Sequence, residues 1–113
     1  MLRASQRLRK SQDFDRLYRR GQFNRSANMV LRTGQNRFDH TRVGVVISKK
    51  VLKRAVDRNR TKRRIAEQVR LFYPQLKPGY DCVVLVKQDI VKLSPTALHD
   101  ELITVFSKAG IVQ

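Results

Sequence analysis

Residues 42–70 read RVGVVISKKVLKRAVDRNRTKRRIAEQVR, and this stretch predicts a strand that leads through a basic connection into a helix. Residues 42–48 are β-branched and almost entirely apolar, a composition typical of strands. Because neither face of the run is polar, we expect a central strand rather than an edge strand. The helix should begin near Asp57 and end at about Tyr73, since Pro74 forbids its continuation.

A second apolar run, YDCVVLV at residues 80–86, follows this helix and predicts another strand. A strand, a helix and a strand in succession indicate a βαβ unit with parallel pairing. Upstream, Phe14, Leu17 and Tyr18 recur at helical spacing after Ser11, which can cap a helix. The first helix should end at Gly21, and a strand at 28–32 and a polar loop at 33–41 should follow it. The last expected element is a helix at 94–106, with Ser94 as N-cap and Pro95 as its first residue. The order α-β-β-α-β-α predicts an α+β class, as a single-domain α-β sandwich with one small central sheet.

The composition indicates a polyanion as the partner. The chain has 113 residues, a hydrophobic share of 41% and a net charge of +16, so one folded domain (1–113) with a basic, flexible segment at 1–10 is expected. That segment lacks the apolar core of a secretory signal; a transit-like segment is the alternative, but its pattern runs directly into the first helix. Cys82 is the only cysteine, which excludes a disulfide framework and favours a reducing cytoplasm.

Six basic side chains and one acid, Asp57, occupy residues 54–64. On a helical wheel of about 100° per residue, the basic side chains separate from an apolar stripe. The stripe contains Thr61, Ile65, Val69 and Phe72; Arg60, Arg63, Arg64 and Arg70 lie opposite, and Arg58 and Lys62 lie beside it. A solvated surface face is one interpretation. Phosphate binding is the other, and it is favoured because arginine dominates and grips phosphate through two parallel hydrogen bonds.

Nucleic acid fits this face better than a membrane surface, because the apolar stripe is needed against the sheet. On the first helix, Phe14 and Tyr18 could stack on unpaired bases, with Arg16, Arg19 and Arg20 close by, or they could be ordinary core residues. His40 and His99 have no ligand or triad spacing, and Cys82 is typical of a buried structural thiol. The sequence therefore predicts a binding module without a catalytic or metal site of its own.

Residues 42–70 resemble the signature of the bacterial ribonuclease P protein subunit. The R-V-G strand is followed by S-K-K at 48–50 and R-N-R at 58–60, and RLRKSQDFDRLYRRG at 7–21 is similar to the family's opening. The similarity spans about residues 7–106. It implies an α-β sandwich with a central cleft and a left-handed βαβ crossover, against the usual right-handed rule.

The resemblance also implies a function. Proteins of this family act with a large RNA subunit, which carries the active site and uses Mg²⁺, to remove the 5′ leader of precursor tRNA. The implied RNA-subunit contacts are Arg54, Arg58, Asn59, Arg60, Lys62 and Arg63. The implied leader contacts are Phe14, Tyr18, Arg32, Ser48, Lys49, Lys50, Lys53 and Lys87. No cofactor of the protein alone, no membrane and no DNA are expected.

Three positions depart from the family pattern. Arg32 replaces a common aromatic residue, Ala66 replaces a typical arginine and Arg64 stands where an apolar residue is common. The resemblance therefore does not imply an RNA contact at Arg64. Asn59 is expected to be a cap or a contact residue. Two other functions remain alternatives: a ribosomal or general RNA-binding protein, and a nuclease that acts without RNA, for which a carboxylate cluster is missing.

Overall fold

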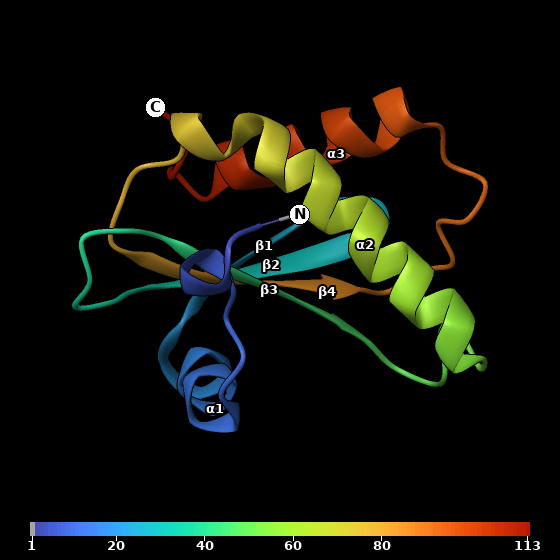
Figure 1. Ribbon diagram of the computed structural model, residues 1–113, viewed down its shortest axis with the longest axis horizontal. Helices are drawn as coiled ribbons and strands as arrows, with labels where there is room; N and C mark the ends of the chain where they lie inside the picture. Colours follow the sequence, from blue (N-terminus) through green and yellow to red (C-terminus); the bar gives the residue numbers. More distant parts are fainter. Residues whose placement is uncertain (1) are drawn as a thin grey trace.

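Four strands form one sheet in the order β1-β2-β4-β3 in the computed structural model, which describes residues 2–113 (Figure 1). Strands β1 (Gln22–Arg25), β2 (Met29–Gln35) and β4 (Tyr80–Val86) pair antiparallel. Strand β3 (Arg42–Ile47) runs parallel to β4. The expected βαβ unit is confirmed, because a helix connects these two parallel strands.

Three α-helices flank the sheet. Helix α2 (Ala55–Phe72) begins two residues before the expected start. It ends directly before the 3₁₀ turn η2 (Tyr73–Gln75), which contains Pro74. Helix α3 (Pro95–Lys108) is capped as predicted, since the Ser94 hydroxyl accepts a hydrogen bond from Ala97 N at 3.1 Å. Helix α1 (Ser11–Arg20) has no side-chain cap bond, so Ser11 is its first residue and not its cap.

The helices cover the two faces of the sheet unequally (Figure 1). Helices α2 and α3 lie on one face and enclose the larger core, where the rings of Phe72 and Phe106 meet edge to face with 5.3 Å between centroids. The predicted stripe of α2 is confirmed, because Thr61, Ile65 and Val69 are buried with Phe72. Helix α1 lies alone on the other face and covers a smaller cluster.

Strand β3 is an edge strand, so the prediction of a central strand is wrong. The central position belongs to β4, where six of seven residues are buried. The apolar composition of β3 has another cause: α2 covers one of its faces, and the chain near the N-terminus shields its outer edge. Leu8 N donates to Val43 O at 3.0 Å, so this edge is partly paired.

Strand β1 was missed because it is short and three of its four residues are exposed, which leaves no alternating pattern. Gly21 precedes it in an extended conformation, φ −73°, and not in the left-handed conformation expected of a helix stop. A Cβ at this position would lie 2.5 Å from Leu17 O, so close packing requires the glycine. The β1–β2 turn is held by Glu101, which accepts hydrogen bonds from Ser26 Oγ and from the backbone and side-chain nitrogens of Asn28.

The N-terminal segment, expected to be flexible, is packed over residues 2–8. Leu2 and Leu8 are buried, and a 3₁₀ turn, η1 (Ala4–Gln6), separates them. Residue 1 lies outside the described part of the chain. This packing places the segment between β3 and α2, where it lines a hollow.

Candidate nucleic-acid interface

The first turns of α2 and the residue before it carry a dense group of polar side chains. We call this group the head of α2 and define it as Arg54, Arg58, Asn59, Arg60, Lys62 and Arg63. Five of them are exposed and Arg58 is half-buried. Because the buried stripe anchors the opposite side of the helix, these side chains are directed away from the core.

Arg58 is engaged within the fold. Its Nη1 donates to Leu52 O at 2.9 Å and to Lys53 O at 2.8 Å, and it thereby fastens the basic connection to the head of α2. Asn59 is exposed inside the helix, five residues after the N-cap Arg54, so the cap interpretation of Asn59 is wrong. Within residues 2–113, Arg60, Lys62 and Arg63 form no ion pair. Their guanidinium and ammonium groups are available to an outside anion.

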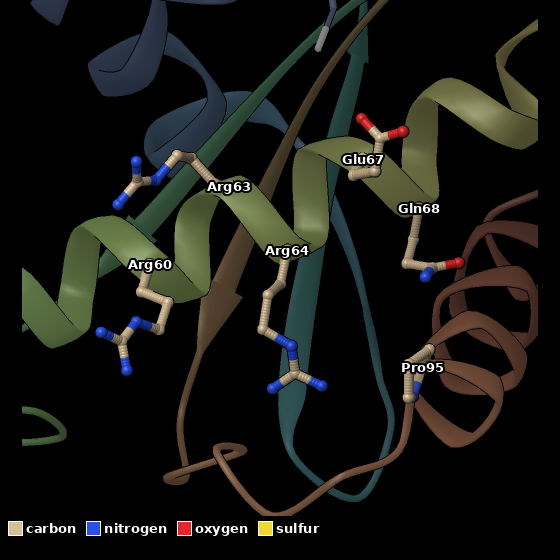
Figure 2. A pocket seen from close by; sticks show the side chains of 6 residues that line it. All are labelled: Arg60, Arg63, Arg64, Glu67, Gln68 and Pro95. Carbon is tan, nitrogen blue, oxygen red and sulfur yellow. The ribbon is translucent and has the colours of Figure 1, made fainter.

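Arg64 differs from its neighbours, as Figure 2 shows. It extends from α2 toward the connection that leads to Pro95, and donates to Ile90 O at 3.1 Å and to Leu93 O at 2.5 Å. The wheel placed Arg64 on the outer face, and the structure corrects this: its side chain is half-buried and clamps the β4–α3 connection. A turn further along, Arg70 pairs with Glu67 at 2.5 Å and lowers the pKa of Glu67 to about 2.

The second candidate surface is the sheet face that α1 covers only in part. We call it the α1 face and define it as Phe14, Tyr18, Phe23, Val30, Arg32 and Val46. Phe14 is half-buried against Gly44, where a Cβ would lie 2.9 Å from its ring, so it packs within the fold and is open only in part. Tyr18 is 42% exposed, and this difference separates two residues that the sequence treated as a pair.

Arginines and aromatic rings alternate across the α1 face. The guanidinium of Arg32 lies 5.3 Å from the centroid of Tyr18 and 5.7 Å from that of Phe23, and the guanidinium of Arg25 lies 5.5 Å from the centroid of Phe23. Cross-strand pairing of Phe23 with Arg32 creates this order. Phe23 is 53% exposed, so the row presents open rings of the kind on which bases stack. Sequence reasoning missed Phe23 and Arg25 because it missed β1.

The remaining predicted leader contacts lie at one edge of the sheet. Ser48, Lys49 and Lys50 follow β3, and Lys87 follows β4; since the strands are parallel, with Ile47 opposite Val86, their ends meet there. All four side chains are exposed. Lys53 is also exposed, but its carbonyl is bonded by Arg58, so it belongs with the head of α2.

A buried carboxylate ties α1 to the sheet. Asp81 is fully buried and accepts hydrogen bonds from Arg16 at 2.7 Å, from Arg42 at 2.8 and 2.6 Å, and from Asn36 at 2.9 Å. Hydrogen bonding to Asp81 raises the pKa of Arg42. Arg16 was expected beside stacked bases, and the structure places it in this network. No sequence pattern marked Asp81, because it opens an apolar strand.

Other titratable groups serve the fold. Burial raises the pKa of the Cys82 thiol, in agreement with a structural role. His40 contacts Asp39 and Ser5 O, and His99 packs edge to face on Phe72. No group of three or more His, Cys, Asp and Glu side chains in residues 2–113 is arranged to hold a metal ion. None of the helices in that range combines the length and apolar character needed to cross a membrane.

Comparisons with known proteins agree on one family. The family model described as Ribonuclease P matches residues 2–110. The ribonuclease P protein component of Synechocystis sp. is 39% identical over 107 residues, covering 94% of this chain and 86% of the relative. That of Cyanothece sp. is 35% identical over 128 residues, with 99% and 98% covered.

Solved structures agree with the fold. A mutant RNase P protein from Staphylococcus aureus has a TM-score of 0.85 at 30% identity, and the match covers 95% of this chain and 90% of that one. The RNase P protein from Thermotoga maritima has a TM-score of 0.82 at 24% identity, with 90% and 96% covered. The expected α+β fold is therefore confirmed.

Proposed function

Because the chain belongs to the ribonuclease P protein family, we propose that its two basic surfaces hold two different RNA segments of one ribonucleoprotein. The chain is the protein subunit of ribonuclease P, and it takes part in an endoribonuclease complex that removes the 5′ leader of precursor tRNA. The further assignments below, of surfaces to RNA segments and of the active site to the RNA subunit, make up the proposal.

The head of α2 is the proposed contact with the RNA subunit. Arg60, Lys62 and Arg63 are exposed and form no ion pair within residues 2–113. The full positive charge of each side chain would therefore be available to attract an RNA phosphate. Arg58 holds the basic connection in place, and Arg54 and Asn59 extend the same surface. The three unpaired cations Arg60, Lys62 and Arg63, on a helix anchored by a buried stripe, are the observation that carries the proposal. Affinity would come mainly from phosphate contacts and would fall with salt.

The α1 face is the proposed contact with the leader. Its exposed rings, Tyr18 and Phe23, alternate with arginines, which is a surface suited to unpaired nucleotides. Ser48, Lys49, Lys50 and Lys87 would guide the leader backbone at the edge where β3 and β4 end, and Lys53 would contact it near α2. Phe14 would contribute the part of its ring that remains open.

The proposed active site lies in the RNA subunit, which would use Mg²⁺, and the complex would work in the cytoplasm. The acids of the described chain that are most enclosed serve the fold: Arg16 and Arg42 neutralise Asp81, and Ser26 and Asn28 bind Glu101. Reconstitution tests the proposal. Precursor tRNA at low Mg²⁺ should be cleaved when a bacterial ribonuclease P RNA and this protein are both present, and the protein purified free of RNA should be inactive. Cleavage by the protein alone, or no effect on the RNA-catalysed reaction, would refute it.

A further inference from the structure

A hollow between the N-terminal segment and α2 lies beside the head of α2 and apart from the α1 face. Its walls include Leu2 and Leu8 from the segment, Val45 from β3 and Ala66 from α2. Its volume is about 390 Å³, which is within the range of small-molecule sites, about 300–1,000 Å³. We call it the β3 hollow.

Ala66 is the smallest of the three side chains that α2 contributes to the wall of the β3 hollow. It lies one turn after Lys62 on α2, and its side chain ends at Cβ. Because Ala66 and Val45 line the same hollow, a longer side chain at position 66 should reduce its volume. The hollow is therefore a property of this particular helix sequence.

Cations surround the apolar walls. Arg7, Arg9, Lys62 and Arg63 all line the β3 hollow, and none of the four forms an ion pair within residues 2–113. Arg7 Nε is buried and has no hydrogen-bond partner in that range. A buried donor without a partner costs free energy, so a ligand that brings an acceptor into the hollow would relieve that cost.

We propose that the β3 hollow binds one unpaired nucleotide of the RNA partner, with the base inside and the phosphate outside. The apolar walls suit the faces of a base, and Arg7 Nε would donate to an acceptor on its edge, because arginine carries donors only. Lys62 and Arg63 are positioned for the phosphate, since both also belong to the head of α2. An acidic peptide would satisfy the cations but would leave the apolar walls unfilled. The inference rests on the proposed function and adds a specific site to it.

The first experiment maps small ligands on the full chain by amide NMR shifts. Guanosine 5′-monophosphate should perturb Leu8, Val45 and Ala66, and should bind at least about tenfold more tightly than ribose 5-phosphate, because only the former buries a base. Inorganic phosphate and hexa-aspartate serve as controls for charge alone. Equal binding of all four ligands, or shifts centred elsewhere, would overturn the inference.

The second experiment fills the hollow without changing charge. Ala66→Met should abolish the preference for guanosine monophosphate over ribose 5-phosphate and reduce affinity for the RNA subunit about tenfold. Ala97→Met, at an exposed alanine on α3, is the matched control and should change neither. If leader cleavage is reconstituted but Ala66→Met binds the RNA subunit as the parent does, only this inference is wrong. If reconstitution itself fails, the proposed function is wrong whatever the hollow binds.

Discussion

The head of α2 and the α1 face both depend on arginine, but they use it differently. On the head of α2, Arg60 and Arg63 form no ion pair within residues 2–113, and each offers a full positive charge to an outside phosphate. On the α1 face, Arg32 is enclosed between Tyr18 and Phe23, with its Nε buried. The first surface is suited to a folded RNA whose phosphates are dense, and the second to single nucleotides that can stack.

The two surfaces also differ in what supports them. The head of α2 belongs to an 18-residue helix whose stripe of four buried residues packs into the larger core. The α1 face depends on a ten-residue helix with one buried residue, Leu17, and on the polar network of Asp81. A substitution that disrupts the Asp81 network should therefore impair RNA binding at the α1 face more than at the head of α2.

The largest effect is expected from Asp81→Ala. Removing the carboxylate takes away the buried acceptor that Arg42 and Arg16 share and leaves them only their longer contacts to Asp13, at 3.4 and 3.3 Å. Breaking such a buried pair costs about 3–5 kcal/mol. Chemical denaturation measures this loss. Asp39→Ala is the matched control, because its side chain is fully exposed, and it should change the free energy of unfolding by less than about 0.5 kcal/mol.

The same variant tests the comparison directly. At a temperature where Asp81→Ala is folded, leader affinity should fall more than affinity for the RNA subunit, because α1 loses the hydrogen bond from Arg16 to the sheet and keeps only the longer Asp13–Arg42 contact. A loss of unfolding free energy below about 1 kcal/mol, or equal losses for both RNAs, would show that the network does not support the α1 face.

The next effect concerns the head of α2. Arg60→Gln with Arg63→Gln should weaken binding to the RNA subunit by about 10- to 100-fold. It should also reduce the slope of log affinity against log salt by about 2, because each of the two arginines would neutralise about one phosphate. Filter binding at several salt concentrations measures both quantities. Arg37→Gln with Lys77→Gln removes the same charge from exposed positions in two connections outside α2. An equal effect there would mean that net charge, and not this surface, determines affinity.

A smaller effect is expected on the α1 face. Phe23→Ala removes an exposed ring next to Arg32, and loss of one stacked base costs about 1–3 kcal/mol. Affinity for precursor tRNA with a leader should therefore fall by about 5- to 100-fold, while affinity for mature tRNA stays unchanged. Phe38→Ala is the matched control, since the two rings are 53% and 51% exposed. Phe14 is less suitable for this test, because its packing on Gly44 also contributes to stability.

The smallest effect concerns pH. Arg70 lowers the pKa of Glu67 to about 2, below the value near 4.3 of an unfolded chain. The pair therefore stabilises the fold above the unfolded pKa, and this contribution is lost as the pH falls from about 4 toward 2. Glu67→Gln should flatten the dependence of the melting temperature on pH in that window, while affinity for the RNA subunit at neutral pH should change little.

Local patterns predicted the elements that have a strong period of their own. The stripe of α2, its end before Pro74 and the cap at Ser94 all depend on near neighbours in the chain, and all are confirmed. Strand β1 has no such period, because three of its four residues are exposed, so Phe23 and Arg25 were missed with it. The apolar run of β3 correctly predicted that the strand is buried. It could not predict that the strand is covered by a helix and by the N-terminal segment, because neither is a near neighbour in the chain.

The sequence by itself determined the charge, the helix that carries it and the family signature at 42–70. The tertiary structure alone decided which arginines are available to RNA. Arg58, Arg60, Arg63 and Arg64 lie within two turns of one helix, yet Arg58 and Arg64 donate to backbone carbonyls of connections that fold back on α2, while Arg60 and Arg63 remain exposed. The physical reason is that a helix sets only the direction of a side chain, whereas its partner comes from segments distant in the chain.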